Sequence, residues 1–348
     1  MTDTLTIVSI DTLSSAAWDD YVASQAGASL YHQSCWQELY HTVFGHRTHY
    51  LAAIDASNKV HGILPLVELK SFLFGHYAVS LPFFNYGGLL ASSETAQQAL
   101  LLAASELSKR LSLRHLELRH TTPIKTAMPC RTDKVLMQLA LPESVELLWR
   151  QLGPKMRAQI KRADRENIVI KEGGAELVAS FYAVFAQNMR DLGTPVYTKK
   201  LFEWIVQAFP DESRIIVIEQ GDKPIAAAFL LGDKRGRLEI PWASSLKEYN
   251  RMSVNMRLYW EVLQYAIAHR YPLFDFGRST MDSGTYRFKK QWGASPVQCY
   301  WYYGLKEGGE LPQLNPDNPK FRLAIRLWQR LPLAWTKILG PVIVKSLP

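Results

Sequence analysis

One order of sequence patterns occurs twice in this chain, at an interval near 160 residues. The segment SLPFFNYGG matches EIPWASS, with Pro82 and Pro241 159 residues apart. The segments RHLELRHT and PLFDFGRST match in the same way, with Leu116 and Phe274 158 residues apart. Solenoid repeats are much shorter, about 20 to 50 residues, so this interval indicates two copies of one domain.

Each copy has the pattern of a mixed α/β domain. In the second copy, strand patterns at 214–219 and 225–231 are joined by a short polar turn, and a third strand follows at 237–242. A helix at 255–268 and a strand at 273–276 come next. A hairpin followed by strand, helix and strand predicts a mixed sheet with helices on its faces. The predicted fold class is α/β with mixed sheets (α+β), in two tandem domains.

The remaining patterns set the domain boundaries. We assign a strand at 134–141 to the first copy, a strand at 297–303 to the second, and one helical region to 144–166. The predicted division is an N-terminal domain at 1–142, a C-terminal domain carrying the active site at 143–306, and a basic amphipathic tail at 307–348.

Composition excludes several classes of protein. No run of about 18 apolar residues occurs, so no transmembrane helix is expected. The N-terminus lacks a basic flank followed by an apolar run, so no signal peptide is expected. The cysteines at 35, 130 and 299 are odd in number and widely spaced, which suits a reducing compartment. These patterns predict a cytoplasmic location, with peripheral contact to the inner membrane as a further expectation.

The positive net charge is concentrated in the C-terminal tail. The formal net charge is +8, and residues 318–348 contain no acid. That stretch carries six basic residues: Lys320, Arg322, Arg326, Arg330, Lys337 and Lys345. Because the charge is a property of the tail, it does not indicate a DNA-binding body. A basic amphipathic segment can lie on an anionic membrane or dock on its own protein, and the sequence leaves both open.

The stretch DFGRSTMDSGTYRFKKQWG, from Asp275 to Gly293, gathers charged and aromatic residues after an apolar strand. Lys289 is a candidate for stabilising negative charge in a reaction, because a cation suits a developing oxyanion. Asp275 and Tyr286 are the other catalytic candidates, and the nearby candidates for substrate binding are Arg278, Phe288 and Trp292. Tyr286, Phe288 and Trp292 recur with a strand-like alternation. The alternative interpretation is a basic surface hairpin.

The segment GPKMRAQIKRADRE predicts a basic helix after Pro154. Its candidates for phosphate contacts are Lys155, Arg157, Lys161 and Arg162. Arg157 and Lys161 share a face, and the start of a helix favours anions. A solvated surface helix explains the same spacing.

The run PWASSLKEYNRMSVNMRLYW passes from a strand to a helix. Ligand groups in α/β sheets favour the carboxyl ends of strands. The polar cluster expected there is Ser244, Ser245, Tyr249, Asn250 and Asn255, with Trp242 just before it. Ser253 is expected to cap the following helix through its side chain.

Other catalytic patterns are missing from the sequence. The histidines at 41, 46 and 49 lack the closer spacing of zinc ligands, so no metal site is expected. Neither a Walker A motif nor a GxSxG motif occurs. No bound cofactor is expected.

Together, KMRAQIKRA, NMRDLGTPVY, EIPWASS, DFGRSTMDSGTYRFKKQWGA and WQRLPLAWTKILGP resemble FemAB-like proteins associated with PEP-CTERM and exopolysaccharide systems. These are related to the Fem peptidoglycan aminoacyltransferases. The resemblance implies two GNAT-type domains, aminoacyl-tRNA as donor, and an acceptor amine on a precursor that carries a diphosphate. It places Lys289 and Phe288 at the acceptor end of the donor, and the cations of the basic helix near phosphate.

The resemblance and the residues together predict an N-acyl or aminoacyl transferase acting on an amine of an envelope polysaccharide or peptidoglycan precursor. Candidates for a general base are Asp275, Asp282 and Glu239. Acetyl-CoA-dependent GNAT domains carry a glycine-rich loop, and the equivalent KEYNRMSVNMR has no glycine, which argues against acetyl-CoA. An acyl-CoA-dependent N-acetyltransferase is one alternative. The other is a scaffold without catalysis that binds a lipid-linked precursor or a partner protein.

Overall fold

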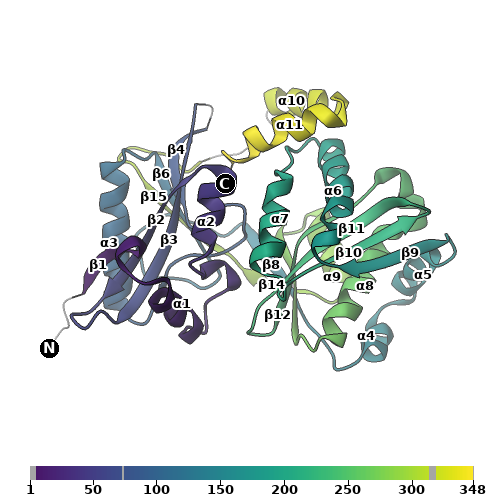
Figure 1. Cartoon of the computed structure of the whole chain (residues 1–348), viewed down its shortest axis with the longest axis horizontal. Helices are drawn as coiled ribbons and strands as arrows, with labels where there is room; N and C mark the ends of the chain where they lie inside the picture. Colours follow the sequence, from purple (N-terminus) through teal and green to yellow (C-terminus); the bar gives the residue numbers. More distant parts are fainter. Residues whose placement is uncertain (1–4, 73, 313–318, 348) are drawn as a thin grey trace. The chain divides into compact units, whose positions relative to one another are not determined.

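The computed structural model describes residues 5–72, 74–312 and 319–347. The chain forms two compact units (Figure 1). The first unit comprises Met1–Val135, Gln298–Gln313 and Lys345–Pro348, and the second comprises Leu136–Val297 and Leu314–Val344.

The first unit is built on a mixed sheet. Its strands are, in spatial order, β1 (Thr6–Ser9), β2 (Arg47–Ile54), β3 (Val60–Ser71), β4 (Gly75–Val79), β6 (His115–His120), β15 (Tyr300–Leu305) and β7 (Cys130–Arg131). The short strand β5 (Leu90–Ala91) pairs with β3 off this path. β4 and β6 run parallel, and the pairs on either side of them, β3 with β4 and β6 with β15, are antiparallel.

The second unit repeats the main path of this sheet, without a counterpart of β5 among its described strands. Its order is β9 (Ile168–Gly173), β10 (Ser213–Gln220), β11 (Lys223–Gly232), β12 (Arg237–Ser245), β13 (Leu273–Thr280), β8 (Lys134–Ala140) and β14 (Ser295–Gln298). β12 and β13 are parallel, as β4 and β6 are. The fold class predicted from the internal repeat is confirmed, and β9 is a strand that the sequence patterns missed.

Two strands differ from their predicted domains. β8, expected in the first copy, lies beside β13 in the second sheet. β15, expected in the second copy, pairs with β6 through six residue pairs in the first sheet. Strand membership is decided by pairing partners rather than by order along the chain, so the predicted ranges 1–142 and 143–306 do not separate the two sheets.

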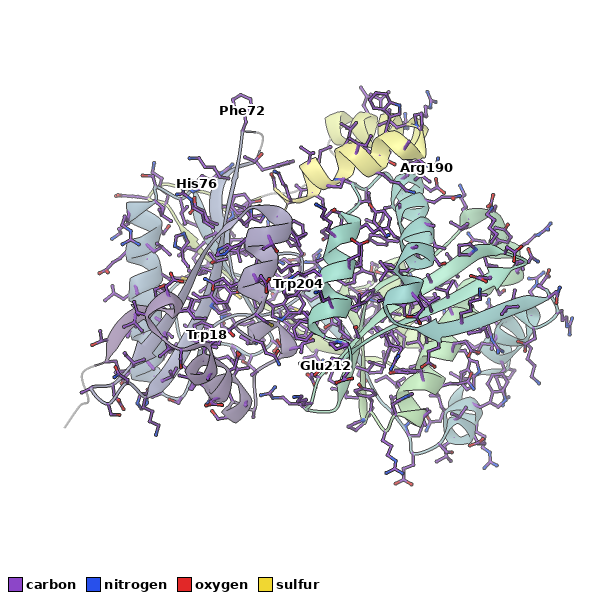
Figure 2. All side chains as sticks on the ribbon, viewed as in Figure 1. Trp18, Phe72, His76, Arg190, Trp204 and Glu212 are labelled. Atoms are coloured by element: carbon purple, nitrogen blue, oxygen red, sulfur yellow. The ribbon has the colours of Figure 1, made fainter. Side chains whose placement is uncertain are left out.

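Helices cover both faces of the first sheet. The helical elements are η1 (Ile10–Thr12), α1 (Ser15–Ser24), η2 (Leu30–His32), α2 (Trp36–Leu39), η3 (Tyr40–Phe44) and α3 (Glu94–Arg110). Leu100 of α3 packs in a core cluster with Leu64 and Ala53. Trp18 of α1 stacks on Tyr50 of β2. The next residue, Leu51, packs against the α3 cluster, and neighbouring side chains of a strand alternate, so Tyr50 points to the other face of the sheet. Figure 2 shows Trp18 and, at the tip of the β3–β4 hairpin, the exposed Phe72.

Helices also cover both faces of the second sheet. They are α4 (Val145–Gln151), α5 (Pro154–Ala163), η4 (Ala175–Leu177), α6 (Val178–Leu192), α7 (Lys199–Ala208), η5 (Lys247–Met252), α8 (Val254–Ala268) and α9 (Gly284–Gln291). Phe181 of α6 and Phe202 of α7 pack edge-on and tilted against Phe229 of β11. α8 takes the opposite face, where its Tyr265 accepts a hydrogen bond from Arg214. The helix predicted at 144–166 is two helices, because Pro154 begins a new one.

The tail forms two helices, α10 (Pro319–Arg330) and α11 (Leu333–Val344), on either side of Pro332. Both pack on α6, and Figure 2 shows them near Arg190 at the carboxyl end of that helix. The tail predicted at 307–348 therefore does not stand apart: its helical part belongs to the second unit. Within the described part of the chain, every helix is too short or too polar to cross a bilayer.

Candidate functional site

The two parallel strands of the second unit separate before they end. The last parallel pair joins Glu239 of β12 to Asp275 of β13. β12 then continues to Ser245, still paired with β11, and β13 continues to Thr280. Because the ends are not held together by parallel pairing, side chains and a ligand have access to this edge of the sheet.

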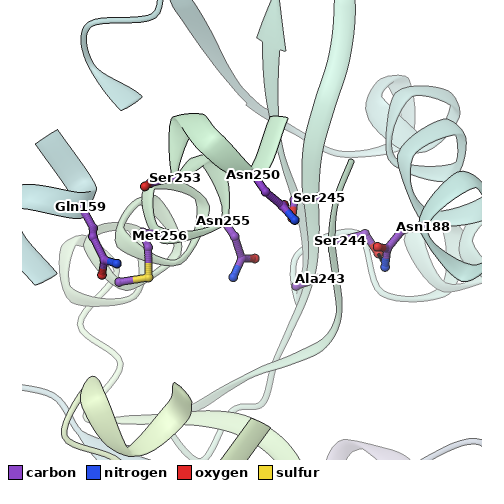
Figure 3. Close-up of a pocket in the computed structure, with 9 residues that line it drawn as sticks. All are labelled: Gln159, Asn188, Ala243, Ser244, Ser245, Asn250, Ser253, Asn255 and Met256. Atoms are coloured by element: carbon purple, nitrogen blue, oxygen red, sulfur yellow. Dashed lines mark hydrogen bonds between the residues drawn. The ribbon is translucent and has the colours of Figure 1, made fainter. Parts of the chain in front are cut away.

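A pocket of about 440 Å³ opens at the carboxyl end of β12 (Figure 3). It is lined by Gln159, Asn188, Ala243, Ser244, Ser245, Asn250, Ser253, Asn255 and Met256. None of these side chains is ionisable. Such a lining offers hydrogen bonds rather than charge to a ligand, which suits amide, ester and hydroxyl groups. One such bond is already made inside the protein, from Asn188 Nδ2 to Ser244 Oγ at 3.1 Å.

The start of α8 borders the pocket and is open. Ser253 has φ 58°, a left-handed conformation, and its side chain makes no capping bond. The predicted side-chain cap is therefore wrong, because this backbone turns the chain into the helix by itself. The Ser253 carbonyl accepts from the N–H of Met256 at 2.9 Å and of Arg257 at 3.2 Å. The N–H groups of Val254 and Asn255 lack an intrahelical acceptor at this end, which suits a ligand oxygen.

Lys289 belongs to α9, and its side chain is buried against β13, with 7% of its surface exposed. Its Nζ donates to the carbonyl of Gly277 at 3.0 Å and to that of Arg278 at 2.8 Å. Burial lowers the pKa of Lys289 to about 8, although the nearby Asp275 acts in the opposite direction. A protonated amine has three N–H donors, so one remains for a substrate oxygen.

Asp275 is fully buried on β13. Its carboxylate accepts from Gln138 Nε2 at 2.9 Å and from the Gly277 N–H at 2.7 Å. Burial raises the pKa of Asp275, against the effect of these two hydrogen bonds. Glu239 is buried at the paired position of β12. These groups with Lys289 form a buried titratable cluster, the kind of arrangement found at functional sites. Among the described side chains, no group of three or more His, Cys, Asp or Glu forms a metal site.

The residues after Asp282 form the helix α9, not the predicted alternating strand. Ser283 caps it by accepting from the Tyr286 N–H at 3.2 Å. Tyr286 and Lys289 are three apart and face inward together, as a helix requires. Tyr286 is buried, and Lys290 Nζ lies 5.9 Å from its ring centroid. Within the described residues, Ser279 Oγ and Trp292 Nε1 are buried without a hydrogen-bond partner. Such atoms are uncommon and mark a place for water or a ligand.

The four cations of α5 do not line the pocket; Gln159 does so in their place. Lys155, Lys161 and Arg162 are exposed, and Arg157 is half-buried. Lys161 Nζ lies 5.7 Å from the ring centroid of Trp149. The inward face of α5 is apolar, so its cations are left at the surface.

The other predicted binding residues fall in three places. Asn250 and Asn255 line the pocket, whereas Tyr249 stands beside it with Lys223 at 5.2 Å from its ring. Trp242 is buried edge-on against Phe202 and Phe229 and serves the core. Arg278 is exposed, and Phe288 and Trp292 pack on Tyr259 of α8.

Sequence reasoning missed Gln159, Asn188, Ala243 and Met256 as pocket residues, and it expected Ser253 only as a helix cap. Gln159 interrupts the cationic face of a basic helix, and Asn188 begins the segment NMRDLG at the end of α6. A polar, uncharged side chain within a charged or apolar helix face is the available signal. Met256 gives no such signal in the sequence, because a methionine in a helix is also typical of a hydrophobic core.

Comparisons with known proteins agree with this architecture. Residues 154–290 match the family profile described as an acetyltransferase (GNAT) domain, and this stretch contains all nine pocket residues and Lys289. The crystal structure of FemX superposes with a TM-score of 0.61 and 13% identity, over 85% of this chain and 97% of FemX. No curated protein sequence matches the chain.

Two further solved structures share the fold. A tandem GNAT protein from the clavulanic acid biosynthesis pathway has a TM-score of 0.54 and 11% identity, over 89% of this chain and 100% of its own. L-PGS from Bacillus licheniformis has a TM-score of 0.52 and 12% identity, over 91% of this chain and 97% of its own. The chain therefore has the fold of two GNAT-like domains in tandem.

Proposed function

We propose that this chain is a transferase that moves an acyl or aminoacyl group onto an amine of a cell-envelope polysaccharide or peptidoglycan precursor. The observation that carries the proposal is the uncharged polar pocket at the carboxyl end of β12, within the stretch that matches an acetyltransferase domain. Serine and asparagine side chains there suit the amide and ester groups of an acyl donor.

The chemistry is direct transfer. The amine nitrogen attacks the carbonyl carbon of an ester or thioester, so a C–N bond forms and the C–O or C–S bond breaks. A proton moves from the nitrogen to the departing oxygen or sulfur. The protonated Lys289 stabilises the negative charge that develops on the carbonyl oxygen, and positioning supplies much of the remaining acceleration. The carboxylates of Asp275 and Glu239 favour the protonated form of Lys289 and so help to keep its positive charge.

For the substrates, aminoacyl-tRNA is our first donor and an anionic, diphosphate-bearing or lipid-linked precursor our acceptor. The exposed cations of α5, Lys155, Lys161 and Arg162 with the half-buried Arg157, favour an anionic acceptor. We place the reaction in the cytoplasm at the inner leaflet, because the acceptor would be membrane-linked. The active site in this proposal is confined to the second unit.

A specific observation favours an acyl-CoA donor as the second candidate. The objection to acetyl-CoA was the lack of glycine in the loop before α8. Ser253 nevertheless adopts φ 58°, a conformation that glycine favours, and leaves N–H groups at the helix start. Such a start binds phosphate oxygens readily.

Mass spectrometry of envelope precursors from cells with and without this protein tests the proposal. Loss of an acyl or aminoacyl mass from a precursor amine is the expected result. Purified protein is then given the identified precursor with either acyl-CoAs or aminoacyl-tRNAs, which separates the two donors. Stabilisation of the protein by the precursor without any product from either donor would instead support a binding scaffold.

A further inference from the structure

The tail helices attach to the second unit by one side each. On α10, Gln329 Nε2 donates to the carbonyl of Asp191 at 3.0 Å, and Ile325 lies against Gly193. On α11, Gly340 lies against Val196, so closely that a Cβ at position 340 would be 2.8 Å from the Val196 nitrogen. These contacts fix which side of each helix faces inward.

The opposite side of α11 is apolar and exposed. Its side chains are Trp335, Ile338, Leu339 and Val342, with exposed fractions of 58%, 66%, 39% and 61%. Their spacing of three, four and seven residues places them on one helical face. Thr336, Gly340 and Val344 are buried on the other side. Water-facing apolar rows of this length mark an interaction surface.

The outer side of α10 adds both apolar and basic groups. Leu323 and Leu327 are 59% and 57% exposed and lie four residues apart. Arg322, Arg326 and Arg330 are also exposed and share that spacing, beside the leucines. Residues 318–348 contain no acid that could neutralise the three arginines.

We propose that the outer face of α10 and α11 binds the surface of an anionic lipid bilayer. We define this tail face by its residues: Leu323, Leu327, Trp335, Ile338, Leu339, Val342, Arg322, Arg326 and Arg330. Helices with an apolar side flanked by cations lie in the plane of such surfaces. Tryptophan favours the boundary between headgroups and acyl chains. Neither helix is long enough to span a membrane, so both lie along its surface.

Charge argues against a second copy of the chain as the occupant. A symmetric dimer would place the same patch against itself, and the three arginines would then meet the partner's arginines at close range. An anionic bilayer neutralises them instead. In this proposal, one side of each tail helix packs on the second unit and the other side binds lipid, so both interpretations of the basic amphipathic segment apply.

Vesicle flotation of the full chain tests the proposal, with phosphatidylglycerol mixed into phosphatidylcholine compared with phosphatidylcholine alone. We expect binding to the anionic vesicles that weakens as salt is added. Ile338→Asp should reduce partitioning about tenfold or more, because a carboxylate then faces the bilayer. The control is Leu102→Asp on α3, at a leucine 63% exposed, which should bind like the unaltered protein. Thermal unfolding of both variants checks that each is folded.

A second readout follows tryptophan fluorescence. Trp335 should shift to shorter wavelength on anionic vesicles and be quenched by brominated lipids, and Trp335→Phe should lose most of that signal. Equal binding to neutral vesicles, or binding unchanged by Ile338→Asp, would overturn the proposal. The proposal would also be overturned if the chain did not bind vesicles but dimerised with rising concentration, and if Ile338→Asp abolished that dimerisation.

Discussion

The two units treat the same point of their sheets differently. In the first unit the parallel pairing of β4 with β6 ends at Val79 and Glu117, yet the loop stays attached to β6. The Ser80 N–H donates to the Glu117 carbonyl at 2.9 Å, and Ser80 Oγ accepts from the Arg119 N–H at 2.8 Å. In the second unit β12 and β13 separate after Glu239 and Asp275. One copy has closed the edge at which the other keeps polar side chains accessible.

A buried acid occupies the equivalent position in each unit, Glu117 in β6 and Asp275 in β13. Glu117 is held by Arg119 Nε at 2.7 Å, and this arginine also lies 4.6 Å from the Trp301 ring centroid. Among the described residues, Asp275 accepts hydrogen bonds from the neutral donors Gln138 and Gly277, and its nearby cations are Arg237 and Lys289. The first acid is therefore structural, and the second belongs to a pair that can titrate.

The largest effect should come from breaking the closed pair. Arg119→Ala leaves Glu117 buried without its cation and should cost about 3 to 5 kcal/mol of unfolding free energy in chemical denaturation. Gln138→Ala, which removes a neutral donor from Asp275, should cost about 1 to 3 kcal/mol. The double variant Glu117→Leu with Arg119→Met should recover much of the loss. Equal losses of unfolding free energy in Arg119→Ala and Gln138→Ala would contradict the distinction between the two acids.

The next effect concerns transfer. Lys289→Ala should lower kcat about 10²- to 10³-fold, because a donor to the developing oxyanion is removed, while the fold persists. Lys290→Ala is the matched control, since that exposed lysine is its neighbour on α9. Turnover by Lys289→Ala at the level of the unaltered protein would refute the role assigned to this lysine.

The titratable pair also predicts how stability depends on pH. The folded protein holds Lys289 with a pKa of about 8, below its ordinary 10.5, so between these values the unfolded chain binds more protons. Unfolding free energy should therefore rise from about pH 8 to 10.5, by about 3 kcal/mol. Lys289→Met should lack this rise. If the unfolding free energies of the two proteins changed equally with pH, the lowered pKa of Lys289 would be contradicted.

The smallest effects compare two helix starts. Ser93 caps α3 by accepting from the Ala96 N–H at 3.1 Å, whereas Ser253 begins α8 with φ 58° and no side-chain cap. Ser93→Ala should lose about 1 kcal/mol. Ser253→Gly should change stability little or raise it by up to about 1 kcal/mol, because glycine adopts this conformation without strain. Thermal unfolding should show a lower melting temperature for Ser93→Ala and no decrease for Ser253→Gly.

The repeat let the sequence predict the sheets, because strand order and turns follow local patterns. The helix predicted at 255–268 matches α8, which spans Val254–Ala268. Exchange of β8 and β15 could not be predicted, since pairing between distant strands has no local signal. The short helix α9 was missed because eight residues give barely two turns of periodicity, and Tyr286 and Phe288 alternate by chance.

The site was predictable where position alone decides. Ser244, Ser245, Asn250 and Asn255 were expected because polar residues follow a strand, and the structure brings all four to the pocket. The buried Lys289 donates to carbonyls twelve and eleven residues earlier in the chain, next to Gly277 with φ 75°, and no sequence pattern predicts this contact. The left-handed Ser253 is likewise invisible to residue type, because serine usually caps through its side chain.

The exchange of β8 and β15 has a consequence for biosynthesis. When the first 135 residues have been made, β6 has no neighbour on one side, because β15 comes from residues 300–305. At roughly 5 to 20 residues per second, that edge stays unpaired for roughly ten to thirty seconds. Open strand edges recruit other chains, so the nascent protein is exposed to aggregation during this interval. The unpaired edge of the first sheet should therefore determine how strongly the nascent chain depends on chaperones. Slower translation of the second half of the chain should lower the yield of soluble protein.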